Sequence, residues 1–225
     1  MAHAEQREFM KRLSDNLNLK FNNVKVLEIG SLDINGSVRD FFTNCDYVGI
    51  DIGEGKGVDI ICEGQKFDAP DDSYDQVISC EVMEHNPYWI ETFNNMLRMC
   101  KPGGLVTMTC ATTGRHEHGT TRTIVCDSPL TVGAGWNYYR NLRETYFRRK
   151  INFDLAFSHF YFNVNWQSLD LVFFGIKRVT PISSELEAAW LASVHAVETY
   201  LKVQNSNIKC RYRAVMAGLF GNVWF

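Results

Sequence analysis

Short apolar runs separated by polar turn residues fill the first half of the chain. Runs of this kind are typical of strands that are buried on both faces of a sheet. They lie at residues 23–30, 47–51, 58–62, 74–80 and 105–110. We therefore predict that these segments form the strands of one sheet.

Helical periodicity appears between the last two of these runs, in the segment that starts at Tyr88. Its apolar residues recur at spacings of three and four, at Ile90, Phe93, Leu97 and Cys100. The sequence KPGG that follows predicts the end of this helix, and SVRDFF (37–42) predicts the start of an earlier one. Strands that alternate with helices predict a parallel sheet covered on both faces, with its ligand at the carboxyl ends of the strands.

The second half of the chain has a different pattern. FDLAFSHFYFNVNW (153–166) and LDLVFFGIKRV (169–179) are aromatic-rich and predict two strands that pair antiparallel at the end of the sheet. A helix is predicted from Ser184, which forms a capping-box pattern with Glu187. One face of this helix is apolar and either packs on the sheet or forms a homodimer contact: Leu186, Trp190, Val194, Val197 and Leu201.

Length and composition limit the class of protein. A chain of 225 residues fits one domain, and a formal net charge of −3 without a basic tail argues against binding of duplex nucleic acid. No apolar run is long enough to span a membrane, and the polar N-terminus lacks the pattern of a signal peptide. The seven cysteines have no CxxC spacing, which favours reduced thiols in a cytoplasmic protein over a zinc site.

The loop after the first strand, in VLEIGSLDINGS (26–37), indicates the kind of ligand. A dinucleotide needs a glycine where Leu32 stands, and Asp33 would repel its pyrophosphate. NAD and FAD are therefore disfavoured. S-adenosylmethionine, which carries an ammonium group and a sulfonium and contains no phosphate, suits an acidic loop better.

Further acids follow in the order that this cofactor requires. Asp51, at the end of the second strand, could accept hydrogen bonds from both ribose hydroxyls, or could be only a helix N-cap. Glu63 could accept from the adenine amino group, or could be only solvated. Gly64 and Gln65 offer backbone groups to the adenine ring.

Four segments between residues 24 and 110 resemble the class I S-adenosylmethionine-dependent methyltransferases of the small-molecule, type 11-like kind. They are VLEIGS, YVGIDIG, CEGQKFDAPDDSYDQVISCEVMEH and LRMCKPGGLVTMT. The resemblance implies an α/β fold, a Rossmann-like three-layer sandwich with a mostly parallel seven-stranded sheet and an antiparallel last strand. It also implies S-adenosyl-L-methionine as cofactor and S-adenosyl-L-homocysteine as product.

The resemblance assigns cofactor-binding roles along the strand ends. It implies that the following residues contact the cofactor: Glu28, Gly30, Ser31, Asp51, Ile52, Glu63, Gly64, Gln65, Ser79, Cys80 and Glu81. The chain departs from the family at Leu32, which replaces the second glycine of the loop. The path of residues 31–36 is left open for this reason.

Three histidines are candidates for the base that an alcohol acceptor requires, since histidine titrates near neutral pH. His118 is the leading candidate, and His116 and His85 are the others. His116 and His118 lie in TTGRHEHGTTR (112–122), which follows the fifth strand and could equally be a solvated polar loop. The sequence offers no convincing carboxylate pair for a divalent ion, so we expect no metal site.

The segment 111–150 is predicted to be an insertion that forms a lid over the acceptor. Its candidate substrate-binding residues are Arg115, Trp136, Tyr138, Tyr139 and Arg140. The aromatic residues suit stacking on a sugar ring or are ordinary packing residues. A basic cluster suits an anionic acceptor or is a solvated helix face: Arg140, Arg143, Arg148, Arg149 and Lys150.

We expect a single methyltransferase domain over residues 1–225, with an N-terminal helical cap (1–22) and a C-terminal helix and tail (183–225). The preferred function is O-methylation of a small polar acceptor such as a sugar or glycan. Alternatives are N-methylation of a nucleobase or other amine, which HNPYW (85–89) superficially suggests, and non-catalytic binding of S-adenosylmethionine.

Overall fold

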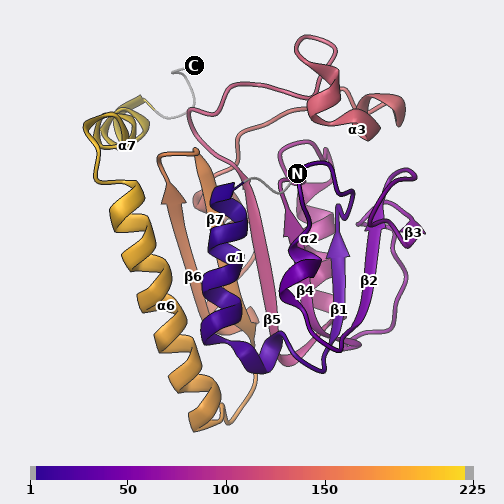
Figure 1. The fold of residues 1–225 in the computed structure, drawn as a ribbon, viewed down its shortest axis with the longest axis vertical. Helices are drawn as coiled ribbons and strands as arrows, with labels where there is room; N and C mark the ends of the chain where they lie inside the picture. Colours follow the sequence, from indigo (N-terminus) through magenta and orange to yellow (C-terminus); the bar gives the residue numbers. More distant parts are fainter. Residues whose placement is uncertain (1–3, 221–225) are drawn as a thin grey trace.

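A seven-stranded sheet forms the centre of the protein, in a computed structural model that describes residues 4–220 (Figure 1). The strand order is β3-β2-β1-β4-β5-β7-β6, parallel from β3 to β5, with β7 antiparallel to both β5 and β6. The strands are β1 (Lys25–Ile29), β2 (Asp46–Asp51), β3 (Ile60–Ile61), β4 (Tyr74–Cys80), β5 (Cys100–Ala111), β6 (Phe157–Asn165) and β7 (Asp170–Lys177). The predicted Rossmann-like fold with an antiparallel last strand is confirmed.

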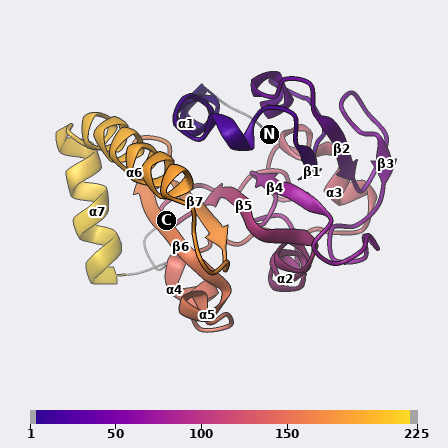
Figure 2. The ribbon, with the colours of Figure 1, turned by 90° about the horizontal axis from the view of Figure 1, so that it is seen from below.

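Helices cover both faces of this sheet and make three layers (Figure 2). One face carries α1 (Ala4–Asn16) and α6 (Ser184–Gln204), and the other carries α2 (Trp89–Met99), α4 (Glu144–Arg148) and α5 (Phe153–Ala156). A separate hydrophobic cluster lies on each side of the sheet. Burial on both faces explains why the central strands consist mostly of apolar residues.

Two further helices, the short α3 (Pro129–Gly133) and the longer α7 (Ile208–Phe220), lie away from the faces of the sheet. Helix α3 lies above the carboxyl ends of β1, β2 and β4. Helix α7 follows α6 on the side of the sheet that ends in β6 (Figure 1). Single 3-10 turns complete the structure at η1 (Asn18–Lys20), η2 (Val38–Phe41) and η3 (Val125–Asp127). Within residues 4–220, no helix combines the length and apolarity needed to cross a bilayer.

The helix predicted at 37–42 is only the single turn η2. Ser37 caps this turn, because its side chain accepts a hydrogen bond from the amide of Arg39. Phe42 then adopts an extended conformation, and its ring stacks on Phe21 with centroids 4.7 Å apart. Packing of this ring overrides the helical tendency of the segment.

Other boundaries differ in smaller ways. The predicted helix does end at Met99, but KPGG (101–104) continues into β5, where the register shifts against β4. The first residues of the predicted aromatic strand form α5, whose first turn is capped by Asn152. The N-cap of α6 is Ser183, which accepts from the amide of Leu186, and Ser184 is its first helical residue.

The apolar face of α6 packs within the chain. Trp190 and Val197 are buried against the sheet, and the ring of Trp190 lies 4.7 Å from that of Phe174 in β7. Helix α1 packs beside α6 on the same face. This face is therefore an intramolecular packing surface, which removes it as a dimer contact. The sequence did not predict α7.

Candidate cofactor and acceptor site

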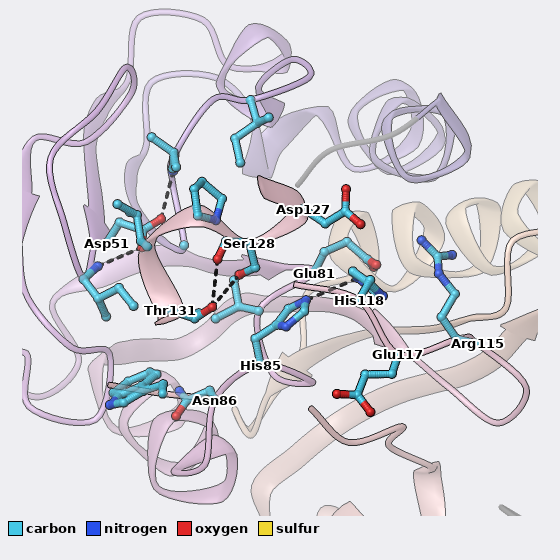
Figure 3. A pocket seen from close by; sticks show the side chains of 18 of the residues that line it. Asp51, Glu81, His85, Asn86, Arg115, Glu117, His118, Asp127, Ser128 and Thr131 are labelled. Atoms are coloured by element: carbon cyan, nitrogen blue, oxygen red, sulfur yellow. Dashed lines mark hydrogen bonds between the residues drawn. The ribbon is translucent and has the colours of Figure 1, made fainter. Parts of the chain in front are cut away.

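A cavity of about 760 Å³ lies at the carboxyl ends of the parallel strands (Figure 3). Gly30 follows β1, Asp51 ends β2 and Glu81 follows β4, and all three line this cavity. Strand ends that converge in this way are the usual ligand site of an open α/β sheet. The cavity is therefore the candidate site.

Gly30 is required at the turn after β1 for two reasons. Its φ of +83° is a conformation that residues with a side chain rarely adopt, and a Cβ there would lie 2.0 Å from Cγ2 of Val82. Its amide donates to the carbonyl of Ile50, 2.8 Å away. The glycine thus lets the turn after β1 lie directly against the segment that follows β4.

Asp51 is held in place by the backbone around it. Its Oδ2 accepts from the amide of Leu32 at 3.1 Å, and its Oδ1 accepts from the amide of Ile52 at 2.8 Å. Burial raises the pKa of this carboxyl, and the two amide hydrogen bonds oppose that rise. A carboxylate oxygen can accept more than one hydrogen bond, so Asp51 keeps acceptor capacity for a ligand.

Asp33 does not line the cavity, which corrects the argument made from its charge. Its carboxylate lies 2.5 Å from Nζ of Lys56 and also accepts from the amide of Gly36 at 2.8 Å. These contacts define the path of the loop 31–36 and direct the charge of Asp33 to the outside. Leu32 and Ile34 line the cavity instead.

Glu28 also lies outside the cavity lining. It is buried in β1, and the hydroxyl of Tyr47 in β2 donates to its Oε2 at 2.8 Å. Burial raises the pKa of Glu28 to about 7, although the bond from Tyr47 favours the charged form. Its contact in this structure is therefore with the neighbouring strand.

The segment predicted to contact adenine lies beside the cavity. The Glu63 carboxylate is 2.6 Å from both Nζ of Lys66 and Nε2 of Gln65, while its neighbours Cys62 and Gly64 line the cavity. Of the other predicted cofactor residues, Ile52 lines the cavity. The following do not: Ser31, Glu63, Gln65, Ser79 and Cys80.

Glu81 has a special backbone conformation at the start of the segment after β4. Its φ of +55° is uncommon for a residue other than glycine, and its amide donates to the carbonyl of Thr109 in β5 at 2.9 Å. Its side chain lines the cavity and accepts from Nε2 of Gln6 at 3.4 Å. Strained residues concentrate at functional sites, which agrees with this position.

His85 and His118 point toward each other at the cavity (Figure 3). Their Nε2 atoms are 3.2 Å apart, and Nδ1 of His118 lies 3.0 Å from the carbonyl oxygen of His116. An Nδ1–H that donates to this carbonyl leaves Nε2 of His118 with its lone pair toward His85. His116 also lines the cavity, so all three candidate histidines meet here.

Burial keeps this histidine pair neutral. It lowers the pKa of His85 to about 3, with a further contribution from neighbouring His118. Burial also lowers the pKa of His118, although the hydrogen bond to His116 opposes the change. Both imidazoles are therefore unprotonated near neutral pH and can accept a proton or bind a cation.

Tyr139 and Gly119 hold the pair in position. The Tyr139 ring packs edge-on against both imidazoles, with centroids 5.3 Å from His85 and 4.9 Å from His118. Gly119 has a φ of +67°, and a Cβ there would lie 3.0 Å from Cε1 of His85 and 2.5 Å from Cβ of Ser128. The loop after β5 can approach His85 only because residue 119 is glycine.

Glu84 is fully buried next to this pair. Its Oε1 accepts from the amide of Ala111 at 3.0 Å, while its Oε2 has no hydrogen-bond partner among residues 4–220. Burial raises its pKa well above the usual range, and the nearby charge of Glu81 adds to this. Glu84, His85 and His118 each place one ligand atom within 4.8 Å of the others, so together they could hold a cation.

Comparison with known families identifies the chain. A profile described as a methyltransferase domain matches residues 1–122, which is more than half of the 225 residues. The chain belongs to this methyltransferase family. It is a class I S-adenosylmethionine-dependent methyltransferase, as the sequence predicted. No curated protein matches the chain in sequence.

Solved methyltransferase structures share the fold at low sequence identity. An N-methyltransferase of Burkholderia thailandensis that acts on 1,6-didemethyltoxoflavin is 13% identical with a TM-score of 0.53, covering 78% of this chain and 79% of that one. A phosphoethanolamine N-methyltransferase of Haemonchus contortus is 13% identical with a TM-score of 0.52, covering 77% and 57%. The chain also spans half the length of a carbon methyltransferase, CurJ, at 14% identity, 71% coverage of this chain and a TM-score of 0.49.

The residues of this methyltransferase fit its cofactor. The cavity is large enough for a nucleoside with an amino-acid side chain. Asp51 offers anchored carboxylate oxygens at the β2 end, as a ribose diol requires, and the Glu81 carboxylate lines the part of the cavity beside β4.

Two of the five predicted substrate-binding residues line the methyltransferase cavity. They are Trp136, whose ring lies 5.9 Å from that of Tyr88, and Arg115, which pairs with Asp170 at 3.1 Å. Tyr138, Tyr139 and Arg140 lie outside the lining.

The basic cluster lies away from the cavity as well. Arg148 pairs with Glu144 at 2.6 Å, and Arg140 lies over the ring of Tyr146. None of the cluster's members lines the cavity: Arg140, Arg143, Arg148, Arg149 and Lys150. The basic cluster therefore gives no support for an anionic acceptor.

Several lining residues were missed because they come from segments without a motif. The stretch 127–131 around α3, the turn 167–169 before β7 and Arg213 of α7 all line the cavity. A Cβ on Gly53 would lie 2.8 Å from Cδ2 of Leu130, so α3 packs directly on the loop after β2. Neither the turn nor α7 was assigned a role from the sequence, and only the tertiary structure brings them to the cavity.

Proposed function

We propose that this methyltransferase transfers a methyl group to a hydroxyl oxygen of a small polar acceptor, with a sugar as the preferred class. The observation that carries the proposal is the neutral His85–His118 pair, which faces the same cavity as Asp51 and Glu81. A hydroxyl must lose a proton to become a good nucleophile, whereas a neutral amine need not. A base next to the cofactor site therefore favours an oxygen acceptor.

S-adenosylmethionine supplies an electrophilic methyl group on a positively charged sulfur. The protein's part is mainly alignment, since methyl transfer is an in-line displacement. Asp51 would hold the ribose end, and Glu81 would lie beside the methionine end. The acceptor would then occupy the part of the cavity next to His118.

Nε2 of His118 would take the proton of the acceptor hydroxyl. The acceptor oxygen forms its new bond to the methyl carbon as the carbon–sulfur bond breaks and its electrons remain on sulfur. In this step His85 would be the Nδ1–H tautomer, so that its Nε2 lone pair accepts the new Nε2–H of His118 and stabilises the imidazolium. His116 would be the next candidate, because it lines the cavity but does not belong to the pair.

The cavity wall supports a polar acceptor. Glu117, Thr131 and Gln167 line it together with Arg115, and Trp136 offers an aromatic face of the kind on which sugar rings stack. These residues come from the loop after β5, from α3, from the segment that follows α3 and from the turn before β7. We infer that residues 111–150 act as the acceptor lid within a single domain.

N-methylation is the second candidate, since two of the solved structures with the same fold are N-methyltransferases by their descriptions. Asn86, the polar residue of HNPYW, argues against a motif of the DNA-amino type here. Its Oδ1 accepts from the amide of Tyr88 at 2.8 Å, and its Nδ2 donates to Thr92 at 2.8 Å. The side chain is therefore occupied within the protein.

The experiment is a methyl-transfer assay with isotopically labelled S-adenosylmethionine and matched acceptors. Each pair presents the same scaffold with a hydroxyl or with an amine: glucose and glucosamine, a catechol and an aminophenol. We expect label on oxygen, at a rate that falls by about 10²–10⁴ in His118→Ala while cofactor affinity is unchanged. Label only on nitrogen would overturn the proposal, and cofactor binding without turnover on any acceptor would favour a non-catalytic binder.

A further inference from the structure

The geometry points to a divalent-metal site formed by Glu84, His85 and His118, at the acceptor end of the cavity and open to a ligand from it. The ion class is that of Zn²⁺ and similar first-row metals. The three side chains come from two segments, the one after β4 and the loop after β5. The inference concerns a binding site, and the ion's catalytic role rests on the proposed O-methylation.

The distances fit one ion bound by three groups. The three ligand atoms lie within 4.8 Å of one another, and the two Nε2 atoms are 3.2 Å apart. Two nitrogens that each lie ~2.1 Å from a common ion, as they do around zinc, would then subtend an angle of about 100° at the ion. This angle lies between the tetrahedral and octahedral values, so an ion could bind both imidazoles without large movement.

The surroundings have the features that orient metal ligands. Nδ1 of His118 lies 3.0 Å from the carbonyl oxygen of His116, and a hydrogen bond of this kind is typical of ligating histidines because it directs the other nitrogen to the ion. The amide of Ala111 holds Oε1 of Glu84 and leaves its Oε2 to accept a further partner. Tyr139 fixes both imidazole rings.

Burial of the Glu84 carboxyl group favours binding of a cation at this position. Glu84 is fully buried, and none of the ion pairs among residues 4–220 includes it. Desolvation of an unpaired charge is costly, so this side chain can be ionised only when a cation binds it and is otherwise neutral. A divalent ion here would bind Oε2 of Glu84 and offset the charge of nearby Glu81.

The donor set selects the kind of ion. Two imidazole nitrogens and one carboxylate oxygen suit Zn²⁺, Co²⁺, Mn²⁺ or Fe²⁺, whereas Mg²⁺ and Ca²⁺ prefer oxygen donors. Three protein ligands leave at least one open position, as in catalytic zinc sites. Because His85 and His118 line the cavity, that position faces the place where the acceptor would bind.

An ion in this position would change how the acceptor is activated. The acceptor oxygen would become its fourth ligand, which lowers the pKa of the hydroxyl, and the hydroxyl proton would pass to solvent water in the cavity. The acceptor oxygen would then attack the methyl carbon, and the electrons of the carbon–sulfur bond would remain on sulfur. His118 would be a ligand in this form of the enzyme and a base in the metal-free form.

The test measures metal binding without any acceptor. Chelator-treated full-length protein is titrated calorimetrically with ZnCl₂, with MgCl₂ as the oxygen-preferring comparison. We expect one Zn²⁺ per chain and no comparable binding of Mg²⁺. His118→Asn and Glu84→Gln should each weaken Zn²⁺ binding by more than the ~10–100-fold that loss of a supporting hydrogen bond costs.

Two controls separate the site from other effects. His195→Asn removes an exposed histidine of α6 and should leave Zn²⁺ affinity unchanged. Circular dichroism and S-adenosylhomocysteine affinity establish that each variant folds. The Co²⁺-loaded protein gives a second readout, because the intensity and position of its visible absorption should change in His118→Asn and remain in His195→Asn.

The outcomes distinguish this inference from the proposed function. Stoichiometric Zn²⁺ binding that both cluster variants weaken supports the site, even if no hydroxyl acceptor is ever methylated. Equal binding by wild type and folded cluster variants overturns it. Transfer to hydroxyls by protein that binds no first-row metal overturns it as well, and leaves the proposed O-methylation standing.

Discussion

The hydroxyl of Tyr47 donates to the buried carboxylate of Glu28 across the neighbouring strands β2 and β1, at 2.8 Å. The contact links two strands whose ends carry the cofactor site, but the carboxylate itself is desolvated. Its pKa is raised from 4.5 to about 7 by burial. Stability should therefore depend on pH through this residue.

Between pH 4.5 and about 7, Glu28 keeps its proton in the folded state, whereas it has lost that proton in the unfolded state. Stability should therefore be highest below this window and fall as pH rises through it, by roughly 3 kcal/mol from this group. Glu28→Gln removes the ionisation and keeps an acceptor for Tyr47. Urea denaturation at pH 5 and pH 8 measures the free energy of unfolding of both proteins. Relative to wild type, the variant should be more stable at pH 8 than at pH 5. An equal difference in stability at the two pH values would contradict the raised pKa of Glu28.

Asp51→Asn should weaken S-adenosylhomocysteine binding. The change removes the charge that would accept from the ribose hydroxyls, and hydrogen bonds to charged groups contribute about 1.5–3 kcal/mol, so we expect a loss of about 10- to 100-fold. Calorimetry measures the affinity. Asp33→Asn is the matched control, because Asp33 pairs with Lys56 outside the cavity and should change the affinity little. Equal losses in the two variants would contradict the placement of Asp51.

Gly30→Ala should destabilise the fold by about 1–3 kcal/mol, because a positive φ and a Cβ 2.0 Å from Val82 are both unfavourable. Denaturant midpoints measure this loss. Adding Val82→Ala should restore only part of it, since the backbone strain remains. Gly133→Ala serves as the control, as a Cβ there meets nothing within 4 Å. Full stability of Gly30→Ala would show that the turn is not constrained as described.

Tyr139→Ala should lower the rate of methyl transfer about tenfold. Each ring contact of Tyr139 with His85 and His118 stabilises the observed orientation of that imidazole by about 0.5–1.5 kcal/mol. Tyr139→Phe keeps the ring and loses only the hydroxyl bonded to Asn141, so it should retain most of the activity. Steady-state kinetics compares the two. If the phenylalanine variant loses as much as the alanine variant, the hydroxyl and not the ring is the important group.

The fold could be predicted from the sequence to the extent that burial fixes it. Strands buried on both faces, such as β4, give short runs that are mostly apolar, and the aromatic pattern of β6 and β7 predicts their antiparallel pairing. The segment 37–42 was misread because ring stacking between Phe21 and Phe42 joins residues distant in sequence. Helix α7 was missed, although its apolar residues Ile208, Tyr212, Val215 and Leu219 recur at helical spacings of three and four and form an exposed face.

The site could be predicted only where one segment contains it. Gly30 and Asp51 lie at strand ends, which the pattern identifies directly. Glu84 could not be identified as a candidate site residue from the sequence, because it is brought close to His118, on another loop, only by the fold. The charge of Asp33 was misleading, since its pairing with Lys56 cannot be read from the sequence.

The cavity is built from two portions of the chain. Residues 1–122, which match the methyltransferase family, supply Gly30, Asp51 and Glu81, while the far wall comes from 127–131, 167–169 and Arg213. Mutations in 167–169 or at Arg213 change the cavity without replacing the groups at the strand ends, whereas 127–131 also packs on the loop after β2 through Leu130. Changes in these later segments can therefore alter which acceptor is methylated while binding of the methyl donor is kept.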